Sequence, residues 1–203
     1  MASIAEGGAI EAWGQLECRR VDFDANYGAW AGGAVCVRDT AGRGTLFLNC
    51  SFTSNRLGSV LGGGAVYFHS DFTQTAHVEN CTFAGNEAGS YGGAIRLNSG
   101  SATLNVKNSI FWTNSAPYGG INIQNLGVLN ISYSCLNTGA GHVDGGTINL
   151  GAGLMNANPL FARDTYPFDV HLKSRFGRWD PGLATWVKDE VTSPCLDAGD
   201  PTS

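Results

Sequence analysis

Charge is scarce in this sequence. Charged residues make up only 14% of the 203 residues, the formal net charge is −5, and no cluster of Lys and Arg is larger than the Arg19-Arg20 pair. Because binding to a phosphate backbone requires a basic surface, we expect no nucleic-acid partner. The chain also lacks any run of about 18 apolar residues, so we expect no membrane span.

Signals of several other protein classes are missing as well. The six cysteines show no C-x-x-C spacing. This argues against a zinc site, and we predict neither a metal nor a cofactor. No helical periodicity with capping residues is visible. Residues 1–6 contain neither a basic nor an apolar segment, so we expect no signal peptide in this chain.

Glycine, in contrast, is abundant and regularly placed. The chain has 29 glycines, and a Gly-Gly pair followed by a small or β-branched residue recurs at intervals of 25 to 31 residues. The six copies are Gly7-Gly8, Gly32-Gly33, Gly63-Gly64, Gly92-Gly93, Gly119-Gly120 and Gly145-Gly146. A period of this length predicts a solenoid, in which each repeat buries its apolar face against its neighbours.

A second motif, Phe-x-x-Asn, lies between the glycine pairs. Its four copies are Phe23/Asn26, Phe52/Asn55, Phe83/Asn86 and Phe111/Asn114. We expect the phenylalanines to stack in the core and the asparagines to form a ladder of amide hydrogen bonds. Three positions before each Phe lie Arg20, Asn49, Asn80 and Asn108. These are turn positions, at which Asn tolerates left-handed backbone and can form a ladder of its own, so that the asparagines after Phe would form a second ladder.

Each repeat contains two segments in which apolar and polar residues alternate, which predicts two half-buried strands. One segment follows the glycine pair and the other precedes Phe. In the first we expect a buried column of Ile10, Val35, Val66, Ile95, Ile121 and Ile148. The next buried column is expected to contain Ala12, Val37, Phe68, Leu97, Ile123 and Leu150.

Strands that return to the same column at such intervals must be parallel. Parallel strands that coil without helices form a parallel β-helix, which is right-handed by default. We therefore predict an all-β right-handed parallel β-helix of about six coils over residues 1–155. Residues 156–203 break the period, and we expect them to be an irregular capping segment of the same domain. Its small core is expected to contain Phe168, Phe176, Trp179 and Trp186.

Over residues 7–125, the combination of Gly-Gly-Ala-Ile/Val with Phe-x-x-Asn resembles the repeats of polymorphic outer-membrane proteins. The resemblance implies the β-helical passenger of an autotransporter, an adhesin function, and an extracellular or cell-surface location. The tail is similar to the terminal segment of large secreted bacterial β-helix proteins, and the similarity lies in residues 158–161, 168–172 and 193–201.

The first strand of each coil is expected to present two outward columns. One contains Glu11, Cys36, Tyr67, Arg96, Asn122 and Asn149, and the other Trp13, Arg38, His69, Asn98, Gln124 and Gly151. Aromatic rings stack on sugar faces, and amides and Arg bond to hydroxyl groups. We therefore predict a binding or scaffold module of a secreted or surface bacterial protein, with a polysaccharide or cell-surface glycan as partner. The expected contacts are Trp13, Arg38, Tyr67, His69, Arg96, Asn98, Asn122 and Gln124.

Two other functions remain open. A polysaccharide lyase could use Tyr67, His69 and Arg96 on adjacent coils as base and charge-neutralising groups. A glycoside hydrolase requires two carboxylates, whereas Glu11 is the only one in these columns. A fully solvated face would instead indicate a purely structural stalk.

The cysteines and the first repeat give three further expectations. Cys50 and Cys81 share a column, so we expect a buried thiol stack, while Cys195 has no evident partner. The first repeat begins at Gly7 without a polar cap, so we expect an excerpt of a longer protein. An uncapped first coil also favours self-association through its strand edge.

Overall fold

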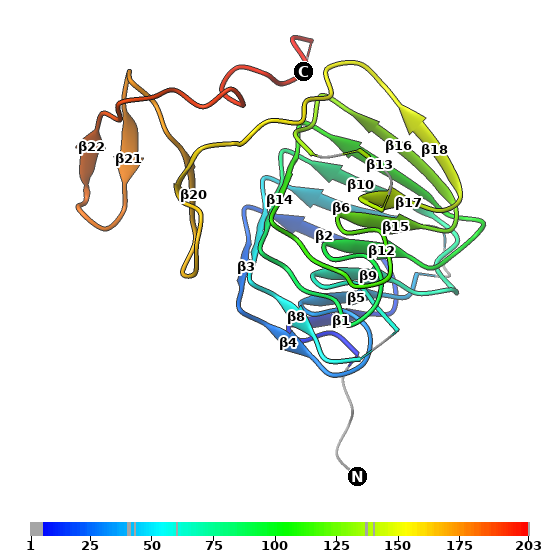
Figure 1. The fold of residues 1–203 in the computed structure, drawn as a ribbon. Helices are drawn as coiled ribbons and strands as arrows, with labels where there is room; N and C mark the ends of the chain where they lie inside the picture. Colours follow the sequence, from blue (N-terminus) through cyan, green and yellow to red (C-terminus); the bar gives the residue numbers. More distant parts are fainter. Residues whose placement is uncertain are drawn as a thin grey trace.

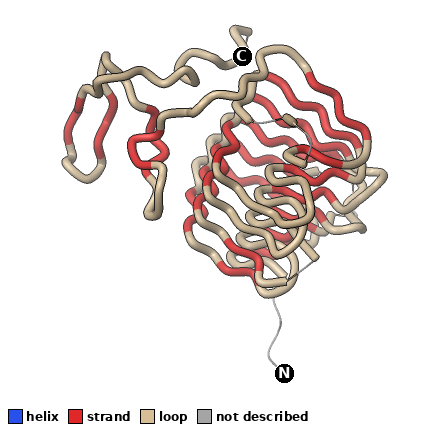
Figure 2. Tube along the Cα trace, in the orientation of Figure 1, coloured by secondary structure: helices blue, strands red, loops and turns tan. Residues whose placement is uncertain are grey.

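The computed structural model describes residues 6–39, 42, 44–59, 61–136, 138–139 and 141–202. This part of the chain consists of strands and turns (Figures 1 and 2). Within these ranges no helix is long and apolar enough to cross a membrane. The strands of three sheets are parallel and stack along one axis, so the fold is the all-β parallel β-helix that the repeats predict.

The three parallel sheets form the walls of the stack. The first contains β1 (Ile10–Ala12), β5 (Val35–Val37), β9 (Val66–Phe68), β12 (Ile95–Leu97), β15 (Ile123–Asn125) and β17 (Val143–Asp144). The second contains β2 (Leu16–Arg19), β6 (Thr45–Leu48), β10 (Thr75–Glu79), β13 (Thr103–Lys107), β16 (Val128–Ser132) and β18 (Thr147–Leu150). The third contains β3 (Asp22–Asp24), β7 (Ser51–Thr53), β11 (Thr82–Ala84) and β14 (Ile110–Trp112). A small pair, β4 (Tyr27–Gly28) and β8 (Arg56–Leu57), follows the third sheet in the first two coils.

Four coils carry a strand in all three sheets, rather than the six coils expected. The coils shorten after β14: Leu104 pairs with Leu129, 25 positions later, but Leu129 pairs with Ile148 after only 19. The sixth glycine pair therefore precedes a strand of the second sheet. Ile148 lies there, outside the first-sheet column in which it was expected.

The first-sheet core column consists of Ile10, Val35, Val66, Ile95, Ile123 and Val143. We expected Ile121 in this column, and this is wrong, because the residue that pairs with Ile95 is Ile123, two positions later. Gly119 pairs with Tyr91 rather than with Gly92, so alignment of the glycine pairs gives a wrong register here. In the next column Leu97 accordingly pairs with Asn125, not with Ile123.

The phenylalanine column is confirmed. Phe23, Phe52, Phe83 and Phe111 are buried, and successive ring centroids lie 4.6 to 4.7 Å apart with nearly parallel planes. The rings stack because β3, β7, β11 and β14 pair in register.

The ladder formed by the asparagines of the Phe-x-x-Asn motif is confirmed as well. Nδ2 of Asn26, Asn55 and Asn86 each donates to Oδ1 of the next asparagine along the stack, at 2.9 Å, and the last acceptor is Asn114. The other predicted turn positions, Arg20, Asn49, Asn80 and Asn108, have φ between 52° and 56°, which is left-handed backbone.

The C-terminal segment, residues 156–202, leaves the stack and lies beside the third sheet (Figure 1). It contains two antiparallel hairpins instead of wholly irregular chain, formed by β19 (Phe161–Arg163) with β20 (Asp169–Leu172) and by β21 (Arg178–Asp180) with β22 (Thr185–Val187). The expected aromatic core is wrong, because Phe176 is 90% and Trp186 71% exposed. The buried aromatic residue of the C-terminal segment is Phe161, while Phe168 lies against Gly85 of the β-helix.

Candidate functional site

One edge of the first sheet carries Trp13, Arg38, His69 and Asn98 one above another, as predicted. Each follows the last residue of its strand, and the backbone N–H of the later three donates to the preceding coil at 2.7 to 3.0 Å. In the next coil this position belongs to Leu126, not to Gln124. The sequence therefore identified four members of this column and misplaced the last two, Gln124 and Gly151, because Gly151 follows a strand of the second sheet.

Arg38 lies at the centre of the polar groups on this edge. Its Nε donates to Glu6 Oε2 at 3.0 Å, and a second guanidinium nitrogen, Nη2, pairs with the same carboxylate. Nη1 lies 3.5 Å from Asp71 Oδ2. The guanidinium carbon also lies 4.9 Å from the ring centroid of Trp13, which is 70% exposed. Arg38 thus contacts two carboxylates and an accessible indole ring.

Side chains of the next two coils contact one another along this edge. His69 Nδ1 lies 3.1 Å from Asp71 Oδ2, and the imidazole meets the Tyr67 ring edge-on at 5.9 Å. Asn98 Nδ2 donates to the Tyr67 hydroxyl at 2.8 Å. Tyr67 itself is buried against Ala31, and this burial raises its pKa. Tyr67 therefore contacts the side chains of His69 and Asn98 from a buried position.

Arg96 and Gln124 are neighbours in the adjacent outward column, which continues to Asp144. The Arg96 guanidinium lies 5.3 Å from the ring centroid of Tyr91, and Nη1 donates to the Leu61 carbonyl at 2.8 Å. Burial lowers the pKa of Arg96.

Asn122 was predicted to point outward beside Arg96, and this is wrong. Asn122 is only 3% exposed, and its backbone carbonyl accepts hydrogen bonds from the N–H groups of Ala94 and Ile95. The register shift that moved Ile123 into the core column also turned Asn122 inward. Asn149, expected in the same column, belongs to the second sheet and pairs with Asn130.

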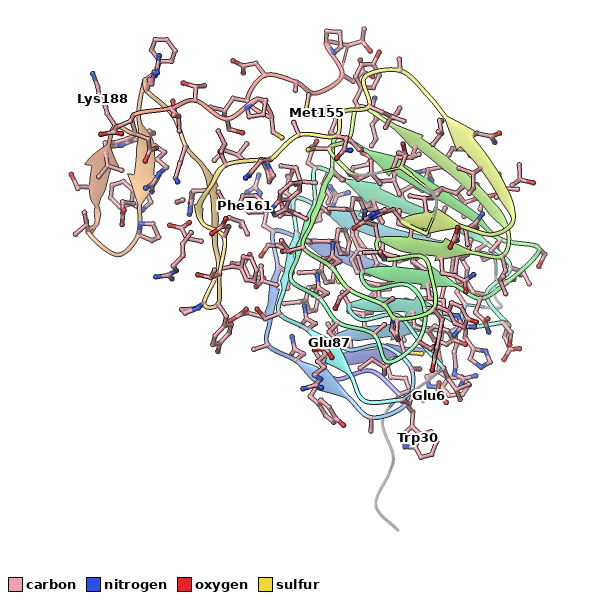
Figure 3. All side chains as sticks on the ribbon, viewed as in Figure 1. Glu6, Trp30, Glu87, Met155, Phe161 and Lys188 are labelled. Carbon is pink, nitrogen blue, oxygen red and sulfur yellow. The ribbon has the colours of Figure 1, made fainter. Side chains whose placement is uncertain are left out.

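A hollow of about 250 Å³ opens at this edge. Its lining residues are Glu6, Trp30, Ala31, Arg38, Leu61, Tyr67 and His69. Trp30 and Leu61 are 47% and 55% exposed, so apolar groups border a polar floor. Figure 3 shows Glu6 and Trp30 at the N-terminal end of the stack.

Sequence reasoning missed an apolar stripe along the turns before the first sheet. It contains Trp30, Leu61, Tyr91 and Tyr118. The rings of Tyr91 and Tyr118 lie 5.9 Å apart, and Tyr118 is 68% exposed. The signal was present, because each of these residues lies one or two positions before a glycine pair.

The chemistry of this site favours binding over hydrolysis. Glu6 and Asp71 are both paired with Arg38. Burial alone would raise the pKa of Glu6, but the hydrogen bonds and charge of Arg38 outweigh it and the pKa is lowered. A general acid for glycoside cleavage needs a raised pKa. The exposed rings and polar groups instead suit stacking on sugars and bonding to hydroxyl groups.

A second and larger groove, of about 620 Å³, lies between the third sheet and the C-terminal segment. Asp22 and Asp24 line one wall, where they accept hydrogen bonds from Ser51 and Thr53 at 2.6 Å. On the other wall His171 Nδ1 lies 2.5 Å from an oxygen of Asp169. No three His, Cys, Asp or Glu side chains of the described ranges are grouped so as to hold a metal ion. Nothing in the sequence pattern brings these two walls together.

Comparison with known proteins gives one match. A family model described as disaggregatase related matches residues 132–199, which are 68 of the 203 residues. The matched segment begins in β16 and includes both hairpins of the C-terminal segment. No curated protein and no solved structure matches the chain.

Proposed function

We propose that this β-helix is a binding module of a secreted or cell-surface protein, and that it binds a polysaccharide or cell-surface glycan along the edge of its first sheet. The observation that carries the proposal is the arrangement of Trp13, Trp30, Arg38 and His69. Trp30, Arg38 and His69 line one hollow, and the exposed indole ring of Trp13 lies against the guanidinium of Arg38. Such a combination stacks on sugar rings and bonds to their hydroxyl groups.

The β-helix suits an extended ligand. Neighbouring parallel strands lie about 4.8 Å apart, so successive coils repeat the binding edge at a short, fixed interval. Asn98, Arg96 and Gln124 extend polar groups beyond the hollow, and Tyr118 extends the apolar border. A rigid surface of this kind loses little conformational entropy when a chain of sugars binds.

Two observations support a location outside the cell. One is the sequence-based expectation that the repeats resemble those of autotransporter passengers, and the other is the partial match to a disaggregatase-related family, which covers the end of the β-helix and the C-terminal segment. Both are similarities over part of the chain, and each points to a surface or secreted repeat module.

A glycan array probed with the purified, fluorescently labelled chain tests the proposal. We expect binding to a limited set of polysaccharides, competed by the same soluble glycan. Incubation of the bound polysaccharides with unlabelled protein tests cleavage in parallel, by the ultraviolet absorbance of unsaturated products and by new reducing ends. Cleavage would replace the binding function by the lyase or hydrolase alternative. A chain that binds no glycan would indicate the structural stalk.

A further inference from the structure

Cys135 and Cys195 lie close together where the C-terminal segment contacts the β-helix. Cys195 Sγ lies 3.8 Å from Met155 Sδ, and the Cys135 thiol donates a hydrogen bond to the Ala157 carbonyl at 3.1 Å. Met155 is the neighbour of Cys135 in the ladder of the stack. Figure 3 labels Met155 at the point where the chain leaves the β-helix. Two cysteines 60 positions apart thus line the same hollow.

The fold directs Cys135 towards the C-terminal segment and away from the core. Isolated bridges join Ile110 to Cys135 and Cys135 to Met155, so Cys135 continues the outward column that begins with Asp22. Three other cysteines, Cys18, Cys50 and Cys81, belong to the hydrophobic core cluster, whereas Cys135 does not. It is covered by the C-terminal segment instead, and it lines a hollow of about 230 Å³ together with Cys195 and Leu172.

We propose that Cys135 and Cys195 are a site of disulfide formation, and that this cross-link fixes the C-terminal segment to the side of the β-helix. Both thiols are free in the structure, and Cys195 is the one cysteine of the chain that is not fully buried. It is therefore the sulfur that an external oxidant reaches first. A secreted or surface protein meets the oxidising conditions in which such bonds persist.

The reaction is a thiol–disulfide exchange with a small-molecule disulfide such as oxidised glutathione. The sulfur of Cys195 attacks one sulfur of the oxidant, which forms a mixed disulfide and releases one thiol. The sulfur of Cys135 then attacks Cys195 Sγ, which forms the protein disulfide and releases the second thiol. The two protons pass to the released thiols, and the oxidant takes up the two electrons.

The chain contains a matched pair for comparison. Cys50 and Cys81 lie on neighbouring coils, and each thiol donates to backbone carbonyl groups. Both lie in the core, with exposures of 3% and 1%. Because the oxidant cannot reach either sulfur in the folded chain, we expect this pair to stay reduced under the same conditions.

A cross-link at this place would act on a segment that has few other attachments. Asp200 contacts the β-helix through Lys107 Nζ at 2.6 Å and through its own N–H, which donates to Asn108 Oδ1 at 2.8 Å. Phe168 contacts the helix near Gly85. A covalent bond between Cys135 and Cys195 would close a loop of about 60 residues. Closing a loop of that size lowers the conformational entropy of the unfolded chain and so stabilises the folded state. It would also preserve the larger groove, one wall of which belongs to this segment.

The experiment is oxidation of the folded chain with oxidised glutathione, followed by mass spectrometry of the intact protein and of its peptides after alkylation. We expect a mass lower by two hydrogen atoms, a cross-linked peptide pair containing Cys135 and Cys195, and alkylated Cys50 and Cys81. The oxidised protein should melt at a higher temperature than the reduced one, and dithiothreitol should reverse both changes. Cys195→Ser and Cys135→Ser should each abolish the cross-link, whereas Cys50→Ser should leave it intact.

Three results would overturn the proposal. One is a wild-type chain that keeps all six thiols, or keeps only a glutathione adduct on Cys195, after prolonged oxidation. Another is a cross-link that joins Cys195 to Cys81, which lines the same hollow from the core side. The third is a cross-link that persists in the Cys195→Ser variant. Circular dichroism of each variant establishes that it is folded before oxidation.

Discussion

The ring of Phe52 lies flat on the ring of Phe83, with centroids 4.6 Å apart and planes 1° from parallel. Phe52 also meets Phe47 of the second sheet edge-on at 5.4 Å. The phenylalanine column therefore joins neighbouring coils and at the same time joins two walls of the stack. In a solenoid each coil contacts only its neighbours, so such contacts carry the cooperativity of the whole fold.

Replacement of Phe83 tests this column at its centre. Phe83→Ala removes a fully buried ring with a stacked neighbour on each side, and we expect the free energy of unfolding to fall by about 3–5 kcal/mol. Urea denaturation followed by circular dichroism measures the change. Phe176→Ala is the matched control, because that ring is 90% exposed, and its effect should stay within about 0.5 kcal/mol. A loss below about 1 kcal/mol at Phe83 would contradict its place in the core.

The asparagine ladder should be costly to interrupt. Asn86→Ala removes the acceptor of two hydrogen bonds from Asn55 and a donor to the Phe52 carbonyl, all in the interior. Leaving such buried groups unpaired costs about 1–3 kcal/mol in unfolding free energy. Asn149→Ala serves as the control, since its bond to Asn130 lies in an exposed ladder on the second sheet. Equal effects at the two positions in urea denaturation would show that burial does not decide the cost.

Binding to the glycan identified on the array should depend on Trp13. Loss of the exposed indole in Trp13→Ala is expected to weaken the affinity about tenfold, because a stacking surface and the support of Arg38 both disappear. Trp186→Ala provides the control, because Trp186 is 71% exposed, like Trp13, but lies on the hairpin of β21 and β22. Isothermal titration calorimetry measures both. An effect at Trp186 but not at Trp13 would move the site to the C-terminal segment.

The attachment of residue 200 should depend on pH. The hydrogen bond from Lys107 lowers the pKa of Asp200 to about 2. Since the folded-state pKa lies below the usual value of about 4, the interaction stabilises the fold above that value and is lost as the pH falls through 2. The melting temperature of wild type should therefore exceed that of Asp200→Asn at pH 7, and the two should converge towards pH 2. A carbon-13 NMR titration of the Asp200 carboxyl group that gave an ordinary pKa would contradict the ion pair.

The first coil should exchange its amide hydrogens faster than the middle of the stack. Among the described residues β1 pairs only with β5, whereas β12 pairs with both β9 and β15. We expect residues 10–12 of a dilute sample of this chain to exchange well before residues 95–97, because an edge strand opens without breaking the stack. Hydrogen–deuterium exchange with mass spectrometry measures both segments. Protection of residues 10–12 that rises with protein concentration would indicate self-association through this edge, and protection equal to that of β12 at every dilution would contradict the prediction.

Much of the repeat structure was predictable because it depends on local period. Phe23, Phe52, Phe83 and Phe111 recur with their asparagines at intervals close to one coil, so the stacked rings and the ladder followed from spacing alone. Trp13, Arg38, His69 and Asn98 fell into one column for the same reason. In each of these coils the glycine pair lies at the same distance before the strand.

The sequence by itself determined the parallel β-helix, its core columns over the first four coils and the outward edge that carries the proposed binding residues. The tertiary structure alone decided what happens where the period changes. The shift at Gly119 turned Asn122 inward and brought Gln124 beside Arg96, because register depends on which backbone groups pair and not on where glycines recur. It also decided that Tyr67 is buried against Ala31, and that Cys135 and Cys195 line one hollow. Those contacts join residues far apart in the chain, and they form because turns and the C-terminal segment pack onto the stack once the coils exist.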